Sequence, residues 1–364
     1  MPAFSGSLNA NEIFSSIFNM IISQQANTAD IKDGFASLVN RARVDGGLYG
    51  DTKLYYDTDV LKSHAWGGDT EASNLLSLDR PKDPECQAIY LNTFRQIRVT
   101  VDYYLSKRAW KDEGAFAQFN STTLGWLRDT KKVYDLTTYN TFIGTHKSSV
   151  QADWNITLST ITSPATTTDE ESEARIRAQK IGQSLADLVI AMRDVSRDFN
   201  DYQHLKSYDE GEITIIFNAK YLNEITKLDL PTIFHKEGIV TKLNQDTLPA
   251  RYFGDVLTAS KTVGAGDNVR ATHETEITVG GQTYHLFAGD QYPVGATVAS
   301  GDGYDVNDNI IAKVVTKLPP YMSAFEVGTS FFNPRSLTEN HYLTFGHNEL
   351  EHLYASPFVT VVEN

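Results

Sequence analysis

Residues 168–225 constrain the fold of this chain more than any other stretch. Thr168 and Glu171 form a Thr-x-x-Glu capping box, which is typical of a helix start. Apolar residues then recur at alternating steps of three and four, so they lie along one stripe of a helix. These residues are Ala178, Ile181, Leu185, Leu188, Met192, Val195 and Phe199. The pattern predicts a helix that buries one narrow face.

A strand and a second helix are predicted next. Residues 213–217 are β-branched and aromatic, which favours a buried strand. Asn218 ends this run and can cap a helix whose apolar residues come at the following turns. These residues are Tyr221, Leu222, Ile225 and Leu228. We therefore predict a packed layered unit, and it contains no catalytic group.

Size, charge and cysteine content limit the class of protein. A chain of 364 residues exceeds the length at which one core usually keeps growing, so two or more sub-domains are expected. The formal net charge of −14 argues against a general nucleic-acid binder held by phosphate contacts. Cys86 is the single cysteine, so no intramolecular disulfide can form. We interpret it as an unreactive thiol in a loop or interface.

The N-terminal region is apolar enough to be either a membrane-spanning segment or an amphipathic helix. Its apolar residues between 13 and 22 follow the spacing of an amphipathic helix, and polar residues interrupt the run. No stretch reaches the roughly 18 apolar residues that a membrane helix needs, and no basic residue precedes Lys32. We predict an arm without a signal peptide, which must bury its apolar face on the body or on a neighbour.

Residues 49–104 are predicted to form a long two-legged excursion. One leg is 52–56, and the other is 87–91 continuing into 97–101. The connection between the legs is longer than usual for a hairpin, so it is either disordered or held by another molecule. Large apolar side chains in the arm and the excursion are candidate subunit contacts, although those of the excursion could equally fold back on their own subunit. The candidates are Phe14, Phe18, Tyr55, Tyr56, Trp66 and Leu76.

The remaining chain alternates between helical and strand-like patterns. Residues 111–145 are predominantly helical, and 150–161 read as a strand. The segment 249–310 is glycine-rich and strand-like, and Gly280-Gly281 favours the two-residue turn of a hairpin over 277–284. A final strand is predicted at 357–362. The fold class is therefore α+β.

The sequence contains no recognisable catalytic, cofactor-binding or metal-binding motif. The best metal candidate combines three histidines with two nearby carboxylates: His341, His347, His352, Glu349 and Glu351. Because His347 and His352 are five residues apart, they would lie on different faces of a helix, so we interpret 347–352 as a polar surface turn. Residues 302–309 resemble a calcium loop in composition but lack its glycine and its glutamate, which favours an acidic turn.

Two short segments resemble the major capsid proteins of tailed bacteriophages. Residues 215–222, Ile-Ile-Phe-Asn-Ala-Lys-Tyr-Leu, look like a recurring strand-to-helix segment of that family. Residues 331–337, Phe-Phe-Asn-Pro-Arg-Ser-Leu, followed by 341–343 and 357–359, are similar to the closing region of capsid proteins from short-tailed, podovirus-type phages. The order of elements along the whole chain also fits this family.

The resemblance implies the Hong Kong 97-like capsid fold. Its parts would be an N-terminal arm at 1–48, an extended loop at 49–109, a peripheral domain with the spine helix at 110–165, an axial domain at 166–310, and a return to the peripheral domain at 311–364. Residues 255–305 depart from the short-tailed relatives and would be a β-rich insertion or an enlarged axial loop.

The resemblance also implies a structural, non-enzymatic virion protein. Hexamers and pentamers would form the icosahedral head around double-stranded DNA, which the shell contacts non-specifically. Assembly in the bacterial host cytoplasm would use a separate scaffolding protein and a portal protein, with no membrane and no cofactor. Two other interpretations remain: an encapsulin-like compartment, and a β-rich phage tail or adhesion protein. A third interpretation is an enzyme, and it depends on the C-terminal histidines alone.

Overall fold

The computed structural model describes residues 34–46, 52–63, 78, 80–102, 113–158, 170–222 and 244–364. Several predicted features lie outside these ranges: the N-terminal amphipathic helix, the capping box at Thr168, the tip of the excursion and the later part of the second helix. In the described part of the chain, no helix combines the length and the apolar character needed to cross a membrane. The fold is mixed α+β, as predicted.

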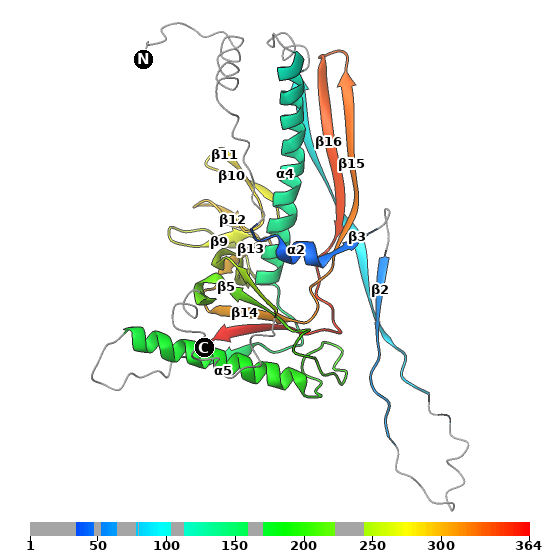
Figure 1. Cartoon of the computed structure of the whole chain (residues 1–364). Coiled ribbons are helices and arrows are strands. Elements are labelled where there is room, and N and C mark those ends of the chain that lie inside the picture. The colour runs from blue at the N-terminus through cyan, green and yellow to red at the C-terminus, as the bar shows by residue number, and fades with distance from the viewer. Residues whose placement is uncertain are drawn as a thin grey trace, which may run out of the picture.

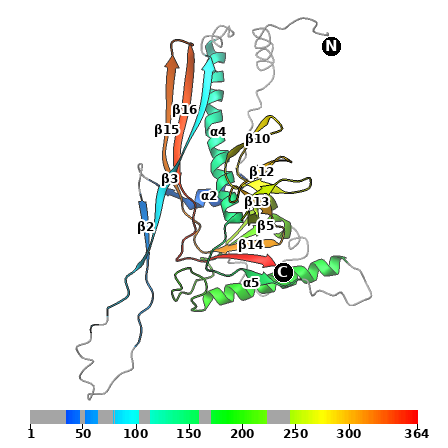
Figure 2. The same ribbon diagram turned by 180° about the vertical axis from the view of Figure 1, so that it is seen from behind.

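A long sheet forms one side of the molecule. Its strand order is β1 (Arg43–Asp45), β15 (Tyr321–Asn333), β16 (Thr338–Asn348), β3 (Glu85–Asp102) and β2 (Thr52–Asp57). β1 is parallel to β15, and the other pairs are antiparallel. Helix α4 (Glu113–Thr145) runs beside this sheet in both views (Figures 1 and 2). Tyr134 of α4 packs edge-on against Phe345 of β16, with ring centroids 5.3 Å apart. The predicted long helix is confirmed.

A second sheet lies at the centre of the molecule, between two layers of helix. Its order is β4 (Trp154–Ile156), β17 (Phe358–Glu363), β14 (Ile310–Val315), β5 (Thr214–Asn218) and β6 (Asn244–Leu248). Ile215 and Phe217 of β5 pack in one core with helix α5 (Glu170–Arg193). Ile216 points the other way, into a core shared with α2 (Ser37–Ala42) and the end of α4. This alternation makes β5 buried on both faces, as predicted.

The predicted helix stripe is confirmed from Ala178 to Met192, but the helix ends before the last two predicted members, Val195 and Phe199. The residues from Ala178 to Met192 are buried against the central sheet. Val195 is 61% exposed, because α5 ends at Arg193 and the chain leaves the helix before Val195. The side chain of Asp194 accepts a hydrogen bond from the Val195 backbone at 2.8 Å, which fixes this exit. Phe199 returns to the core from the following loop.

Asn218 lies at the corner between β5 and a helical turn, as predicted. Its side-chain amide donates to the carbonyl of Ile310 at 3.0 Å. Its side-chain oxygen accepts from the backbone of Lys220 at 3.1 Å, which is the capping contact expected of an N-cap asparagine. The side chain is fully buried, so both of its polar groups need these partners.

The segment that follows β6 folds into a β-rich unit with its own small core. Val269, Tyr292 and Val298 are among the buried residues of this core. A short 3-10 helix, η3 (Ala250–Tyr252), leads into the unit. Its strands are β7 (Gly254–Val256), β8 (Lys261–Thr262), β9 (Val269–Ala271), β10 (Thr275–Val279), β11 (Gln282–Leu286), β12 (Thr297–Val298) and β13 (Gly303–Val306). β10 and β11 form the predicted hairpin, with Gly280 at φ 60° and Gly281 at φ 84°.

Two assignments from the sequence are wrong: a predicted turn contains a strand, and a predicted strand is much shorter than expected. The acidic turn predicted at 302–309 contains β13, because Tyr304 is buried and its hydroxyl donates to the carbonyl of Arg251 at 2.6 Å. Within the run predicted at 150–161, the described residues form a strand only at β4. The Ser148 hydroxyl accepts from the backbone of Val150 and Gln151, which holds the start of that run in a turn.

Each of the two large sheets combines strands that are distant in the sequence. The C-terminal segment 311–364, assigned as a whole to the peripheral domain, supplies β15 and β16 to the long sheet. It also supplies β17 and nearly all of β14 to the central sheet. In the central sheet, β14 lies between β5 and β17, so it joins the segment 166–310 to the C-terminus.

Candidate subunit-contact surface

The ribbon formed by β2 and β3 presents an uncovered apolar face. In its antiparallel register Thr52 lies opposite Tyr90, Leu54 opposite Ala88 and Tyr56 opposite Cys86, and residues directly opposite each other share a face. We call the side of the ribbon that carries Leu54, Tyr56, Cys86 and Tyr90 the outer face. On it Leu54 is 51% exposed, Tyr56 64% and Tyr90 58%. Three large apolar side chains are thus exposed side by side on one strip of sheet, and an exposed apolar patch of this kind is typical of an interaction surface.

The inner face of the same ribbon is buried against the body. Ile89 and Leu91 of β3 pack with Met322 and Leu353, and Tyr55 lies at the edge of this cluster. Burial raises the pKa of the Tyr55 hydroxyl. The ribbon is therefore attached to the body through one face only, and the other face is free for a contact outside this chain.

The structure separates the predicted contact residues. Tyr55 and Tyr56 lie on opposite faces, so Tyr56 belongs to the outer face and Tyr55 folds back on its own subunit. Phe14, Phe18, Trp66 and Leu76 lie outside the described residues. Other exposed apolar side chains of the ribbon and its legs were missed: Leu54, Val60, Leu61, Leu78 and Tyr90. Alternation along 52–57 could have identified Leu54, because strand residues two apart share a face.

Cys86 lies near one end of the ribbon, beside its last residue pair, Asp57 opposite Glu85. It is the second residue of β3 and is exposed opposite Tyr56. The interpretation as a loop or interface thiol is thus refined, because the residue belongs to a strand and lies on the outer face.

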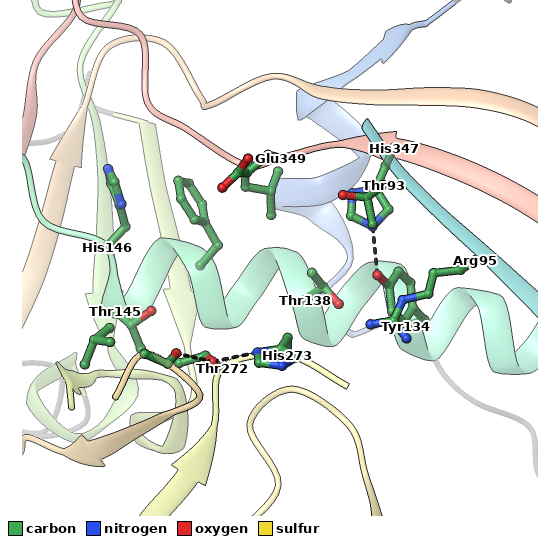
Figure 3. A pocket seen from close by; sticks show the side chains of 14 residues that line it. Thr93, Arg95, Tyr134, Thr138, Thr145, His146, Thr272, His273, His347 and Glu349 are labelled. Carbon is green, nitrogen blue, oxygen red and sulfur yellow. Dashed lines mark hydrogen bonds between the residues drawn. The ribbon is translucent and has the colours of Figure 1, made fainter. Parts of the chain in front are cut away.

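His347 and His352 are buried, so the interpretation of 347–352 as a polar surface turn is wrong, whereas His341 in β16 is only partly buried. His347 belongs to β16 and is 5% exposed. Its Nδ1 donates to the carbonyl of Asn348 at 2.7 Å, and its Nε2 therefore accepts from the Tyr134 hydroxyl at 2.7 Å (Figure 3). Burial lowers the pKa of His347, which keeps the ring neutral. The sequence spacing concealed this role because the partner lies on α4.

His352 belongs to a buried hydrogen-bonded array. Its Nε2 donates to the carboxylate of Asp201 at 2.8 Å, so its Nδ1 accepts from Nε2 of His146 at 2.8 Å. Burial, followed by the nearby His352 and Lys313, lowers the pKa of His146 to about 3. Among the described residues, no group of three histidines, cysteines or carboxylates is placed to hold a metal ion.

A cleft of about 420 Å³ lies between α4, the long sheet and the β-rich unit. Figure 3 shows Arg95 beside the ring of Tyr134, with Thr272 and His273 across the cleft. Arg95 lies 3.7 Å from the carboxylate of Glu274, and Thr272 contacts His273 at 3.0 Å. The contact between Arg95 and Glu274 joins β3 to the β-rich unit across this cleft.

The architecture combines a long sheet beside a long helix, a central sheet covered by helices, and an extended ribbon, and this fold is similar to that of chains in solved phage structures. The chain is similar to a chain in the capsid structure of Staphylococcus phage Andhra, with a TM-score of 0.51, 10% identity, and 86% and 81% of the two chains covered. It is also similar to a chain in the structure of the head fiber and inner core protein gp22 of native bacteriophage P68. That TM-score is 0.54, with 10% identity and 87% and 82% coverage. No protein-family model and no curated protein sequence matches the chain.

Proposed function

We propose that this chain is a structural protein of a phage head, which associates with copies of itself to form the closed icosahedral shell. The observation that carries the proposal is the outer face of the ribbon. Its apolar side chains are uncovered, and the legs of the ribbon extend away from the body (Figures 1 and 2). A second copy can bury such a surface in a large obligate interface. The capsid-like fold supports the same role.

The finer assignment follows the Hong Kong 97-like plan. The ribbon of β2 and β3 is the extended loop, α4 and the other strands of the long sheet form the peripheral domain, and the central sheet with the β-rich unit forms the axial domain. Hexamers and pentamers assemble in the host cytoplasm on a separate scaffolding protein and portal protein, and the product is the virion head. The net charge of −14 supports a shell that contacts its packaged double-stranded DNA without gripping it.

Polar substitution of the outer face is expected to reduce the yield of shells strongly while leaving the subunit folded. In Leu54→Ser with Tyr56→Ser, two exposed side chains lose the apolar area that a neighbour would cover. Full burial of such a side chain contributes about 1.5–3 kcal/mol, so the particle yield should fall about tenfold or more. Sedimentation and negative-stain microscopy of the protein co-expressed with its scaffolding protein measure the yield.

The matched control is Val294→Ser, which makes the same kind of change at a site 63% exposed on the β-rich unit. The Val294→Ser variant should assemble normally. The double variant and this control should both have melting temperatures within a few degrees of that of the parent protein. Parent protein that stays monomeric under every condition would contradict the proposal. Trimers or fibres would favour a tail or adhesion protein, and shells that enclose protein cargo without DNA would favour an encapsulin-like compartment.

A further inference from the structure

The ribbon is joined to the loop after α5 by charged hydrogen bonds. Asp57, the last residue of β2, accepts from Nδ1 of His204 and from Nζ of Lys206, both at 2.7 Å. Lys206 also donates to the carbonyl of Ala355 at 2.8 Å, so it connects the ribbon to the C-terminal segment. His204 is 3% exposed, so the imidazole side of this contact is shielded from water. Charge-assisted hydrogen bonds of this length are strong and directional.

Two residues further along, Asp59 makes a second contact with the same loop. Its carboxylate accepts from the guanidinium of Arg197 at 2.8 Å and from the backbone of Leu205 at 3.0 Å. The hydrogen bond from Arg197, followed by the one from Leu205, holds the pKa of Asp59 below its usual range. The carboxylate is therefore charged at neutral pH, and Arg197 has a fixed partner.

The loop that receives both carboxylates is itself stiff. We call residues 196–206 the clamp loop. Ser196 and Lys206 close it with two backbone hydrogen bonds of 3.0 Å. Inside it, the side chain of Asn200 both donates to the carbonyl of His204 and accepts from its backbone N–H, each at 2.8 Å. A closed and internally bonded loop can hold a partner in one orientation.

The clamp loop is anchored to the body on its other side. The backbone of Asp201 donates to the carbonyl of Tyr354 at 2.8 Å. Its carboxylate accepts from His352, Ser148 and Gln151, each at 2.8 Å. Burial alone would raise the pKa of Asp201, but these hydrogen bonds outweigh it, and the pKa lies below its usual range. The anchor is thus a buried carboxylate with its partners in place.

The other leg of the ribbon is fixed at the same level. Gln87 of β3 lies opposite Tyr55 in the register. Its amide donates to the carbonyl of His352 at 2.9 Å, and its oxygen accepts from the backbone of Tyr354 at 3.0 Å. Both legs therefore meet the body at one platform, formed by the clamp loop and residues 352–355. Beyond it, the legs run away from the body in both views (Figures 1 and 2).

We propose that the clamp loop, through Asp57 and Asp59, sets the direction in which the ribbon leaves the body. It thereby aims the outer face at the neighbouring copy. The direction of the ribbon is a property of the single subunit. The aiming of the outer face at a neighbouring copy rests on the proposed function. Asp57 and Asp59 are positioning residues, because they lie where the pairing of β2 with β3 ends and the chain leaves the body, and they act through the geometry of the ribbon. A polar clamp also allows the ribbon to be released, since breaking it exposes charges to water and leaves the apolar cores intact.

The test measures the direction of the ribbon in the unassembled subunit. Spin labels at Leu61→Cys on the β2 leg and Ile190→Cys on α5, both exposed positions, report the distance between ribbon and body in a Cys86→Ala background. The parent should give one narrow distance distribution. Asp57→Ala with Asp59→Ala should shift the ratio of clamped to released ribbon by about tenfold or more. Arg197→Ala removes one contact from the opposite side and should broaden the distribution in the same way.

The matched control is Asp83→Ala, which removes a carboxylate from the β3 leg outside the clamp and should leave the distribution narrow. A narrow distribution in both the double variant and Arg197→Ala would overturn the clamp. Shells formed at parental yield from a subunit with a released ribbon would overturn the aiming step. If the parent forms no shells but the double variant broadens the distribution, the clamp stands and the proposed function fails.

Discussion

Replacing Gly144 with alanine is expected to destabilise the unassembled subunit by about 3 kcal/mol. Gly144 lies in the last turn of α4, where the helix crosses η3. A Cβ at this position would overlap the backbone carbonyl of Tyr252. Because the obstacle is backbone, no change of rotamer can relieve the overlap, and either the helix or η3 must move.

The surroundings of Tyr252 oppose such a movement. Phe253, the next residue, is buried in the core shared by α2, α4 and the central sheet. The ring of Tyr252 also packs against Gly289. A Cβ added to Gly289 would lie 2.8 Å from the Cε1 atom of this ring. Gly289 has a φ of 82°, so that close approach already uses a glycine. A shift of η3 therefore disturbs packing on two sides, and the free energy of unfolding should fall accordingly.

A matched control lies in the same helix. Gly125 has no atom within 4 Å of a Cβ built upon it. Gly125→Ala should therefore stabilise the subunit by about 0.5–1 kcal/mol, through helix propensity and a less disordered unfolded chain. Urea unfolding followed by circular dichroism gives both values. Equal effects of the two substitutions would contradict the close crossing of α4 and η3.

The accuracy of the sequence predictions depends on whether a feature is local. The stripe from Ala178 to Met192 and the hairpin at Gly280 were predicted correctly, because helix period and turn chemistry are written in neighbouring residues. The exit from α5 was missed at Val195. An apolar residue can continue a periodic pattern after the helix has ended, since periodicity carries no end signal of its own.

Features that depend on distant pairing could not be predicted. Strand alternation separates Tyr55 from Tyr56, but which of them faces the body is decided by the pairing of β2 with β3 and by the contact of β3 with Met322. The partners of His347 and His352 come from α4 and the clamp loop, more than 150 residues away along the chain. Strand register across such separations is set by the whole core, and a single sequence shows none of it.

Lys313 is another residue whose setting only the fold reveals. It lies in β14, the strand at the middle of the central sheet, and its side chain is fully buried. Its Nζ donates to the carbonyl of His146 and to the hydroxyl of Thr360, both at 2.8 Å. Burial, reinforced by the positive charge of Lys147, lowers the pKa of Lys313 to about 7. The carboxylates of Asp153 and Asp255 act in the opposite direction and only partly compensate.

The stability of the subunit is therefore expected to rise with pH between about 7 and 10. The unfolded chain holds a proton on Lys313 up to about pH 10.4, whereas the folded chain releases it near pH 7. Wherever the unfolded state binds more protons, stability increases with pH, here by roughly 1 kcal/mol per pH unit. The rise ends above pH 10, because the unfolded chain then also releases the Lys313 proton. Burial raises the pKa of Tyr139 and Tyr321, so at still higher pH the folded state holds the extra protons and stability falls.

Lys313→Met should remove this rise and give a nearly flat dependence over the same window. The slope is the decisive quantity, because methionine also leaves the His146 carbonyl and the Thr360 hydroxyl without their donor, which lowers stability equally at every pH. Lys220→Met, at a partly exposed lysine that pairs with Asp308 on the surface, should keep the parental slope. Urea unfolding of the three unassembled proteins at pH 7, 8, 9 and 10 measures it. An unchanged slope in Lys313→Met would show that another group takes up the proton on unfolding, whereas a flat profile in that variant alone assigns the alkaline stabilisation to one buried amine.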